Sequence, residues 1–376
     1  MPVAAAPFLP ISDQQVLERL PARAADPRAR DMVRLRQQLS SRPRDVGLAV
    51  QLARRYYDEV AAEGDPRYIG YAQAALAPWW AQTDAPVEVR VMRAVLRQFS
   101  HEFEPAIADL QSAVRAAPDN AEAWAWLAAI AMVQARYADA RSACERLQTL
   151  SPAMIGPACL ASVDATTGHA GAAAATLRHV LDANQSASGA EQLWVLTRLA
   201  EAQLRLGHHE AAEASFRRAL ALDITDGYLL AAYADFLLDR QRPAEVLTLL
   251  RGRERSDLLL LRLALAGKAV GAAQTAAWTA DLTARFDAAR LRGDTVHQKE
   301  EARFALVMLG DTRRALELAR LNFGVQREPV DARVLFEAAL AARQPAAAEP
   351  ALKWWQASGI ESPELRTLVG QIKAAS

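Results

Sequence analysis

The segment WAWLAAIAMVQARYADA, Trp124 to Ala140, shows the pattern of apolar and polar positions that recurs along the chain. It opens with an apolar run and then turns polar, and it contains neither glycine nor proline. The apolar run starts at Ala123 and stops before Gln134. Crossing a bilayer takes roughly 20 apolar residues, so this run is too short for a membrane span.

Small and apolar residues recur at matching offsets in successive segments. Pro118 and Pro152 lie 34 positions apart (118 to 152), and each ends a helical pattern. Matching residues in four segments are Ala94, Ala106, Leu110 and Ala113; Leu127, Ala128, Ala131, Ala140, Cys144 and Leu147; Leu196, Leu199, Ala200, Ala212, Phe216 and Ala219; and Leu230, Tyr233, Ala234, Val246 and Leu250. The pattern therefore indicates an internal repeat.

This repeat resembles the tetratricopeptide repeat, a helix–turn–helix unit with a 34-residue period. Small residues such as Ala128 and Ala140 allow the two helices of a hairpin to approach closely. The resemblance covers roughly residues 45–360 and is strongest over 87–154 and 193–250. It implies an all-α protein, an α-solenoid whose stacked hairpins form a right-handed superhelix, here of an alanine-rich, bacterial type.

We expect three parts in the chain. Residues 1–44 form an N-terminal arm with capping helices, and residues 45–360 form the superhelical domain. Dividing the length of that domain by the repeat length gives about nine hairpins. Residues 361–376 form a C-terminal helix that caps the last hairpin, because the end of a solenoid needs a polar outer face.

Charge and composition narrow the function. Lys+Arg and Asp+Glu both number 44, for a formal net charge of +0. Nucleic-acid binders usually carry a basic excess, so we expect no nucleic-acid partner. The start of the chain lacks a basic and apolar leader, but VAAAPFLP is typical of the residues left after signal cleavage. We therefore expect a periplasmic or exported protein if the chain is a mature form, and a cytoplasmic protein otherwise.

Only two cysteines are present, Cys144 and Cys159. They fall in the second helix of one hairpin and the first helix of the next, which pack together in this architecture. A disulfide requires Cα atoms roughly 4.4–6.8 Å apart, which two close helices can provide. The alternative is a pair of buried thiols. A bridge would favour an oxidising compartment, and free thiols the cytoplasm.

Motifs for catalysis are absent from the sequence. It has no Gly-x-Ser-x-Gly elbow, phosphate-binding loop, paired glycine fingerprint or His-Glu-x-x-His spacing. His208 and His209 lie together in a hairpin turn, but no third metal ligand is placed by spacing. We therefore expect no enzyme, no cofactor and no metal site.

Two polar segments, 292–303 and 322–333, each precede the first helix of a hairpin and lie about one repeat apart. Stacking should bring them together at one edge of the solenoid. One interpretation is a polar pocket of a small-molecule-binding or hydrolytic protein, and the other is an ion-pair network that fixes hairpin geometry. The residues concerned are Asp294, His297, Glu300, Arg327 and Asp331.

The resemblance also implies a binding face, because tetratricopeptide proteins usually bind ligands along the concave surface of the first helices. This groove begins apolar and becomes charged, and it lacks the basic residues of chaperone-tail clamps. We expect a non-enzymatic scaffold or adaptor that binds a protein or extended peptide there, and the sequence leaves its oligomeric state open. The groove positions are Val91, Val95, Trp126, Ala129, Met132, Thr197, Arg198, Glu201, Tyr228, Asp235 and Asp239.

Overall fold

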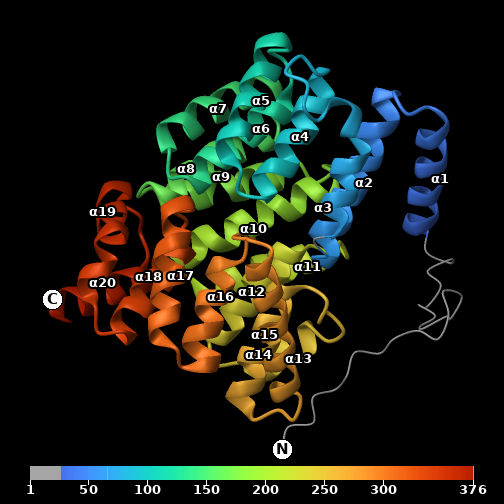
Figure 1. Ribbon diagram of the computed structural model, residues 1–376. Coiled ribbons are helices and arrows are strands. Elements are labelled where there is room, and N and C mark those ends of the chain that lie inside the picture. Colours follow the sequence, from blue (N-terminus) through green and yellow to red (C-terminus); the bar gives the residue numbers. More distant parts are fainter. Residues whose placement is uncertain (1–26, 66, 376) are drawn as a thin grey trace, which may run out of the picture.

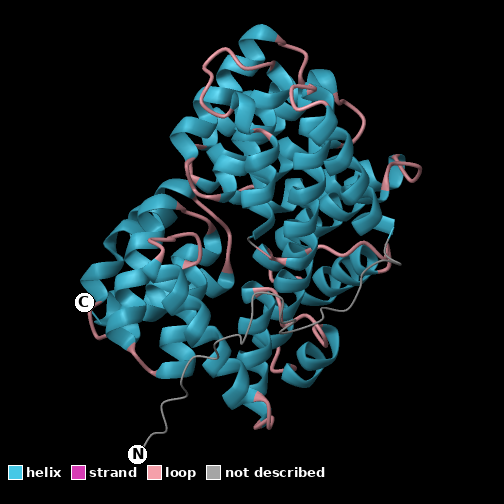
Figure 2. Cartoon of the chain, turned by 45° about the vertical axis from the view of Figure 1, so that its right-hand side comes forward, coloured by secondary structure: helices cyan, strands magenta, loops and turns pink. Residues whose placement is uncertain are grey.

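The computed structural model describes residues 27–65 and 67–375, and within these ranges it contains helices and no strand (Figure 2). The helices are α1 (Pro27–Ser41), α2 (Val46–Glu63), α3 (Arg67–Ala75), α4 (Val87–Phe99), α5 (Phe103–Ala116), α6 (Ala121–Val133), α7 (Tyr137–Leu150), α8 (Ile155–Thr166), α9 (Ala170–Ala183), α10 (Gly189–Arg205), α11 (His209–Leu220), α12 (Gly227–Asp239), α13 (Pro243–Leu249), α14 (Asp257–Val270), α15 (Thr275–Leu291), α16 (Gln298–Phe304), α17 (Thr312–Val325), α18 (Pro329–Ala341), α19 (Glu349–Ser358) and α20 (Pro363–Ala375). Short helical turns are η2 (Ala77–Trp79), η3 (Ala305–Leu309) and η4 (Pro345–Ala348).

Side chains that accept a backbone hydrogen bond set the starts of several helices. Asp45 Oδ1 accepts from the Leu48 amide at the start of α2, and Asn120 caps α6 in the same way. Ser188 and Glu191 form a reciprocal capping box at the start of α10. These caps satisfy amides that have no partner inside the helix.

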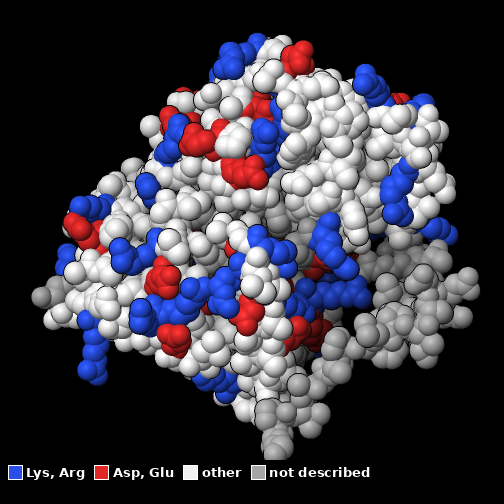
Figure 3. Space-filling view, viewed as in Figure 1, with Lys and Arg blue, Asp and Glu red and all other residues white. Residues whose placement is uncertain are grey.

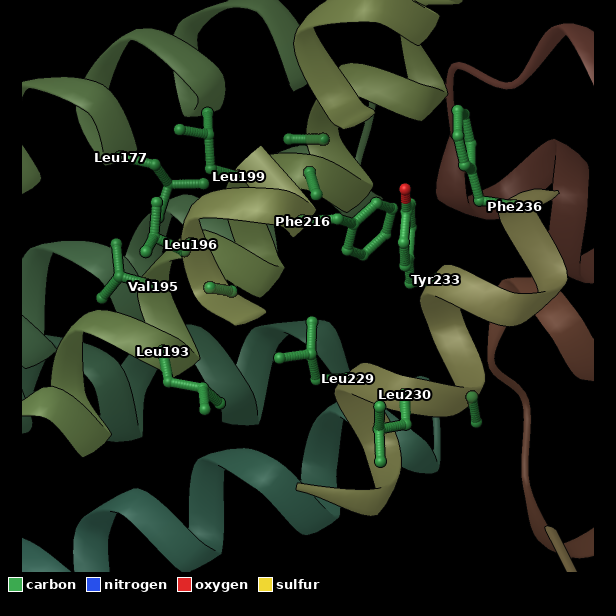
Figure 4. Packing of buried hydrophobic residues seen from close by; sticks show 14 of the residues in the cluster. Leu177, Leu193, Val195, Leu196, Leu199, Phe216, Leu229, Leu230, Tyr233 and Phe236 are labelled. Carbon is green, nitrogen blue, oxygen red and sulfur yellow. The ribbon is translucent and has the colours of Figure 1, made fainter. Parts of the chain in front are cut away.

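Consecutive helices pack as hairpins, and the hairpins stack into an α-solenoid. The small residues expected at the hairpin contacts lie there, with Ala128 2% and Ala140 0% exposed. The largest apolar cluster runs without a break from α8 to α14. Figure 4 shows part of it, in which the Phe216 and Tyr233 rings lie 5.5 Å apart between successive hairpins.

The N-terminal hairpin packs against a helix from the middle of the chain. Helix α2 packs against α12, where the Gly227 backbone lies close to the Ala61 carbonyl. Arg255 and Glu63 form an ion pair of 3.6 Å beside this contact. The first 26 residues of the expected N-terminal arm lie outside the described residues, and α1 is the described part of that arm.

The C-terminal helices α17–α20 lie beside α8–α10 (Figure 1), and segments at their ends contact the turns after α6 and α8. Three hydrogen bonds mark this contact, which we call the seam. The Arg327 amide donates to the Val133 carbonyl (2.8 Å), Trp354 Nε1 donates to the Tyr137 hydroxyl (2.9 Å), and the amide of Ala170, the first residue of α9, donates to Glu361 (2.7 Å). The solenoid therefore closes on itself. Helix α20 packs Leu365, Val369 and Ile372 into the C-terminal core.

Candidate functional site

The apolar half of the expected groove is mostly core. Val91, Val95 and Thr197 are each 2% exposed, so they have no surface to offer a partner. Trp126 is half-buried and packs edge-on against the Tyr57 ring at 6.2 Å. Ala129 is exposed and Met132 is half-buried.

The charged half of this face carries ion pairs made within the chain. Glu201 accepts a hydrogen bond from the Tyr228 hydroxyl (2.5 Å) and pairs with Arg198 at 3.0 Å. The Arg198 guanidinium also lies over the Tyr228 ring, 4.8 Å from its centre. Tyr228 keeps 47% of its surface exposed.

Asp235 and Asp239 are neutralised by arginines from later hairpins. Arg262 Nη2 lies 2.6 Å and Arg303 Nη1 3.0 Å from the Asp235 carboxylate. Burial alone would raise the pKa of Asp235, but these two guanidinium groups hold it well below its usual range. Asp239 pairs with Arg333 at 2.8 Å. Cations of α14, α16 and α18 therefore already neutralise these two carboxylates.

The predicted polar edge divides into separate parts. Lys299 lies 4.0 Å from Glu300 and 3.7 Å from Asp331. Burial alone would lower the pKa of Lys299. The carboxylates of Asp331 and Glu300 outweigh this effect and raise the pKa above its ordinary value, so the lysine stays charged. Asp331 also accepts hydrogen bonds from the Asn322 side chain (2.9 Å) and the Glu328 amide (2.8 Å). This part is an ion-pair network between hairpins.

The other members of the predicted edge lie in the loops before α16 and α18. Asp294 accepts from the Val296 amide in its own loop (2.9 Å), and His297 is the residue before α16. Arg327 lines a pocket to which Asp294, His297, Glu300 and Asp331 do not contribute. The interpretation in which all five residues line one pocket is therefore not supported, because the turn before α18 directs Arg327 to the seam.

The pocket at Arg327 measures about 1160 Å³ and lies at the seam between the α6–α7 turn and helices α17–α19. We call it the seam pocket. Its buried side is formed by Phe323, Leu335 and Trp354, and the exposed Leu321 stands at its edge. The remaining lining residues are Ala135, Arg136, Tyr137, Ala138, Asp139, Glu317, Arg320, Gly324, Arg327, Pro350, Lys353, Ala357 and Ser358.

Four cations stand around the seam pocket, and two of them have partners. Arg136 pairs with Asp139 at 2.6 Å, and Lys353 pairs with Glu349 at 2.7 Å. Arg320 and Arg327 make no side-chain hydrogen bond or ion pair within the described residues, and both are exposed. Elsewhere on α16–α18, acidic and basic side chains alternate (Figure 3).

Residues 195–223 match a family model described as "Tetratricopeptide repeat". These residues cover most of the α10–α11 hairpin. The match identifies the α10–α11 hairpin as a tetratricopeptide repeat. Proteins of this fold generally mediate protein–protein interactions and are typically non-enzymatic scaffolds.

Solved structures resemble this chain at low identity. The Cut9 complex in "APC/C hetero-tetramer Cut9-Hcn1" is 13% identical, with 93% of this chain and 59% of that chain covered and a TM-score of 0.48. Yeast Tom70 is 10% identical, with 94% and 85% covered and a TM-score of 0.43. A tetratricopeptide repeat protein from Parabacteroides merdae is 12% identical, with 77% and 98% covered and a TM-score of 0.37. No curated protein sequence gives a significant match.

The repeat pattern gave no signal for the seam pocket. Tyr137 and Trp354, whose hydrogen bond closes it, are 217 residues apart. Repeats specify contacts between neighbours, whereas this contact depends on how far the whole superhelix turns. Two exposed apolar residues on α17, Leu321 and Val325, are the local hint, and of these Leu321 lines the pocket.

The described residues contain neither a candidate metal site nor a candidate membrane span. Over residues 27–65 and 67–375, no three His, Cys, Asp or Glu residues are grouped so as to hold a metal ion. Within the same ranges no helix has both the length and the apolar character needed to cross a membrane.

A disulfide joins two neighbouring hairpins of the chain. Cys144 in α7 and Cys159 in α8 form a disulfide with Cα atoms 5.4 Å apart. Both residues are buried, and Ala158 and Ala161 beside them leave room for the close approach of the helices.

Proposed function

We propose that this protein is a non-enzymatic scaffold or adaptor that binds a protein or peptide partner. The seam pocket is the observation that carries the proposal. It is an apolar recess at the surface of a fold that generally serves protein–protein interaction. Exposed apolar recesses with a polar rim commonly mark interaction sites.

The concave groove is the competing surface for the same function. Ala129 and Tyr228 remain exposed there. Its carboxylates, however, are already paired with the chain's own arginines. A partner that used them would have to break these internal ion pairs, so the seam pocket is the better site for a first contact.

Site-specific photo-crosslinking in an extract of the source cells tests the proposal. A crosslinking amino acid replaces Leu321 at the seam pocket, Tyr228 on the concave face, or Leu291, which is 87% exposed at the end of α15. We expect one partner protein to crosslink at Leu321 and not at Leu291. Crosslinking at Tyr228 alone would move the site to the groove. Absence of a specific product at both positions would contradict the scaffold function.

We also propose that the protein works in an oxidising compartment, in the periplasm or outside the cell. The disulfide between Cys144 and Cys159 supports this location, because such bonds persist mainly in oxidising spaces. Fractionation of the source cells, followed by immunoblotting, is the test. Recovery with cytoplasmic markers would contradict the proposal.

A further inference from the structure

We infer that the seam pocket binds an acidic segment of a partner polypeptide through apolar anchor side chains. This inference rests on the proposed scaffold function and adds the chemistry of the partner. Three features of the pocket support the inference. Its floor is apolar and already ordered, its size suits several residues of a peptide, and two arginines at its rim have no partner within the described residues.

The floor of the pocket is apolar and held in place before any ligand binds. The Trp354 ring packs edge-on against Phe323 at 6.3 Å, and its indole N–H donates to the Tyr137 hydroxyl. Burial raises the pKa of Tyr137 to about 12, so this hydroxyl remains neutral. A floor that is already ordered costs little entropy when a ligand binds.

The size of the pocket favours a chain segment over a single small molecule. Pockets for small ligands measure about 300–1,000 Å³ and enclose most of the ligand. The seam pocket, at about 1160 Å³, is larger, and exposed residues such as Leu321 and Ala357 line it. A short helix or extended segment that lays its apolar side chains into a groove fits this shape.

The rim supplies the preference for acidic side chains. Among the rim carboxylates, Asp139 is paired with Arg136, and Glu317 lies 3.5 Å from Arg314. Arg320 and Arg327 have no such partner in the described residues. The Arg327 amide donates to Val133, which fixes the backbone that presents this side chain beside the pocket. An acidic residue next to an apolar anchor would therefore find a guanidinium group within reach.

Selection from a displayed library of random dodecapeptides tests this inference. The full chain serves as bait, and binders to the Arg320→Gln/Arg327→Gln variant are removed. We expect the enriched peptides to combine Leu, Phe or Trp with Asp or Glu. Enrichment of basic or uncharged peptides would overturn the inference, and so would the absence of enrichment. Preferential binding of dodecanoate, or a Leu321 crosslink between two copies of this chain, would also overturn it.

Affinities of an enriched peptide then locate the site. The Arg320→Gln/Arg327→Gln variant should weaken binding by about three- to tenfold at low salt, and less at high salt, because exposed ion pairs are screened. Leu321→Ser should weaken binding at both salt concentrations. The matched control is Arg313→Gln/Arg366→Gln, which removes two exposed arginines outside the pocket. Equal losses in the control would contradict the assignment.

The two proposals can fail separately. Retention of the crosslinked cellular partner by the Arg320→Gln/Arg327→Gln variant, with full affinity, would refute the acidic-segment inference and leave the scaffold function standing. If the unaltered chain crosslinks to no specific partner, both the scaffold function and the acidic-segment inference are refuted. Circular dichroism of each variant confirms that the helices remain folded.

Discussion

Arg93 is a single side chain that holds three segments together. It is 3% exposed, its guanidinium contacts both oxygens of Asp109 (2.8 and 2.6 Å), and Nη1 donates to the carbonyls of Trp79, Trp80 and Gln82. The turn after α3 therefore depends on this residue for its hydrogen bonds. A buried pair of this kind is costly to break from one side.

We expect Arg93→Met to lower the free energy of unfolding by about 3–5 kcal/mol, because Asp109 and three carbonyls lose a buried partner. Chemical denaturation measures the change. Arg290→Met is the control, since Arg290 and Asp287 form a pair in which both side chains are more than half exposed, and it should cost less than about 1 kcal/mol. Similar costs for the two variants would show that Arg93 is not structural.

His101 gives the molecule a dependence on pH. Burial lowers its pKa to about 4, and Lys299 adds to this effect, while Glu300 and Asp331 oppose it. A histidine whose pKa is lower in the folded state stabilises the fold fully above about pH 6.5. That contribution is lost as the pH falls towards 4. As the pH is lowered from 6.5 to 4, the denaturant concentration at the midpoint of unfolding should fall in the unaltered chain. We expect a smaller fall in His101→Gln. Identical pH profiles would contradict the assignment.

The sequence predicted some of these residue roles and missed others. The sequence predicted that the groove becomes charged at positions such as Glu201 and Asp235. The pattern could not tell that Arg262 and Arg303, 27 and 68 residues beyond Asp235, neutralise that carboxylate. A repeat predicts which positions face inward, but not which later hairpin reaches them.

At the scale of elements, the disulfide joins two hairpins across a sequence separation of 15 residues. Closing a loop of this length stabilises a fold by roughly 2–4 kcal/mol. We expect Cys144→Ala/Cys159→Ala to unfold at lower denaturant concentration by about that free energy, and reducing agent to destabilise only the unaltered chain. Thiol titration of unreduced, denatured protein checks the bond itself. Two reactive thiols per chain would contradict it.

Hairpins could be predicted because their signals are local. Alanines at the helix contacts and caps such as Asn120 lie within one 34-residue period. The sequence of a single repeat is therefore enough to predict its hairpin. The short helix α16 runs directly into η3, a turn of π-helix, and no feature of the sequence pattern indicated this. Such a turn depends on the packing around it.

At the scale of the whole molecule, the seam is the feature that sequence could not provide. Gly168 lies opposite the carbonyl of Gly359, and a Cβ added at Gly168 would lie 2.8 Å from that oxygen. Gly168 stands in the turn between α8 and α9, and its φ of +84° is one that glycine adopts readily. Its second role, close contact with a segment 191 positions further on (168 to 359), follows from the curvature of the entire solenoid.

Gly168→Ala should loosen the seam. The variant suffers backbone strain of about 1–2 kcal/mol at positive φ, and in addition its Cβ pushes against Gly359. Gly271→Ala is the matched control, because Gly271 has a φ of +69° and no atom within 4 Å of an added Cβ. Both variants should therefore lose stability, but only Gly168→Ala should speed hydrogen exchange in α9 and α20 together, since Glu361 then releases the Ala170 amide. Exchange confined to residues near 168, with α20 unchanged, would mean that the solenoid does not depend on this contact to stay closed.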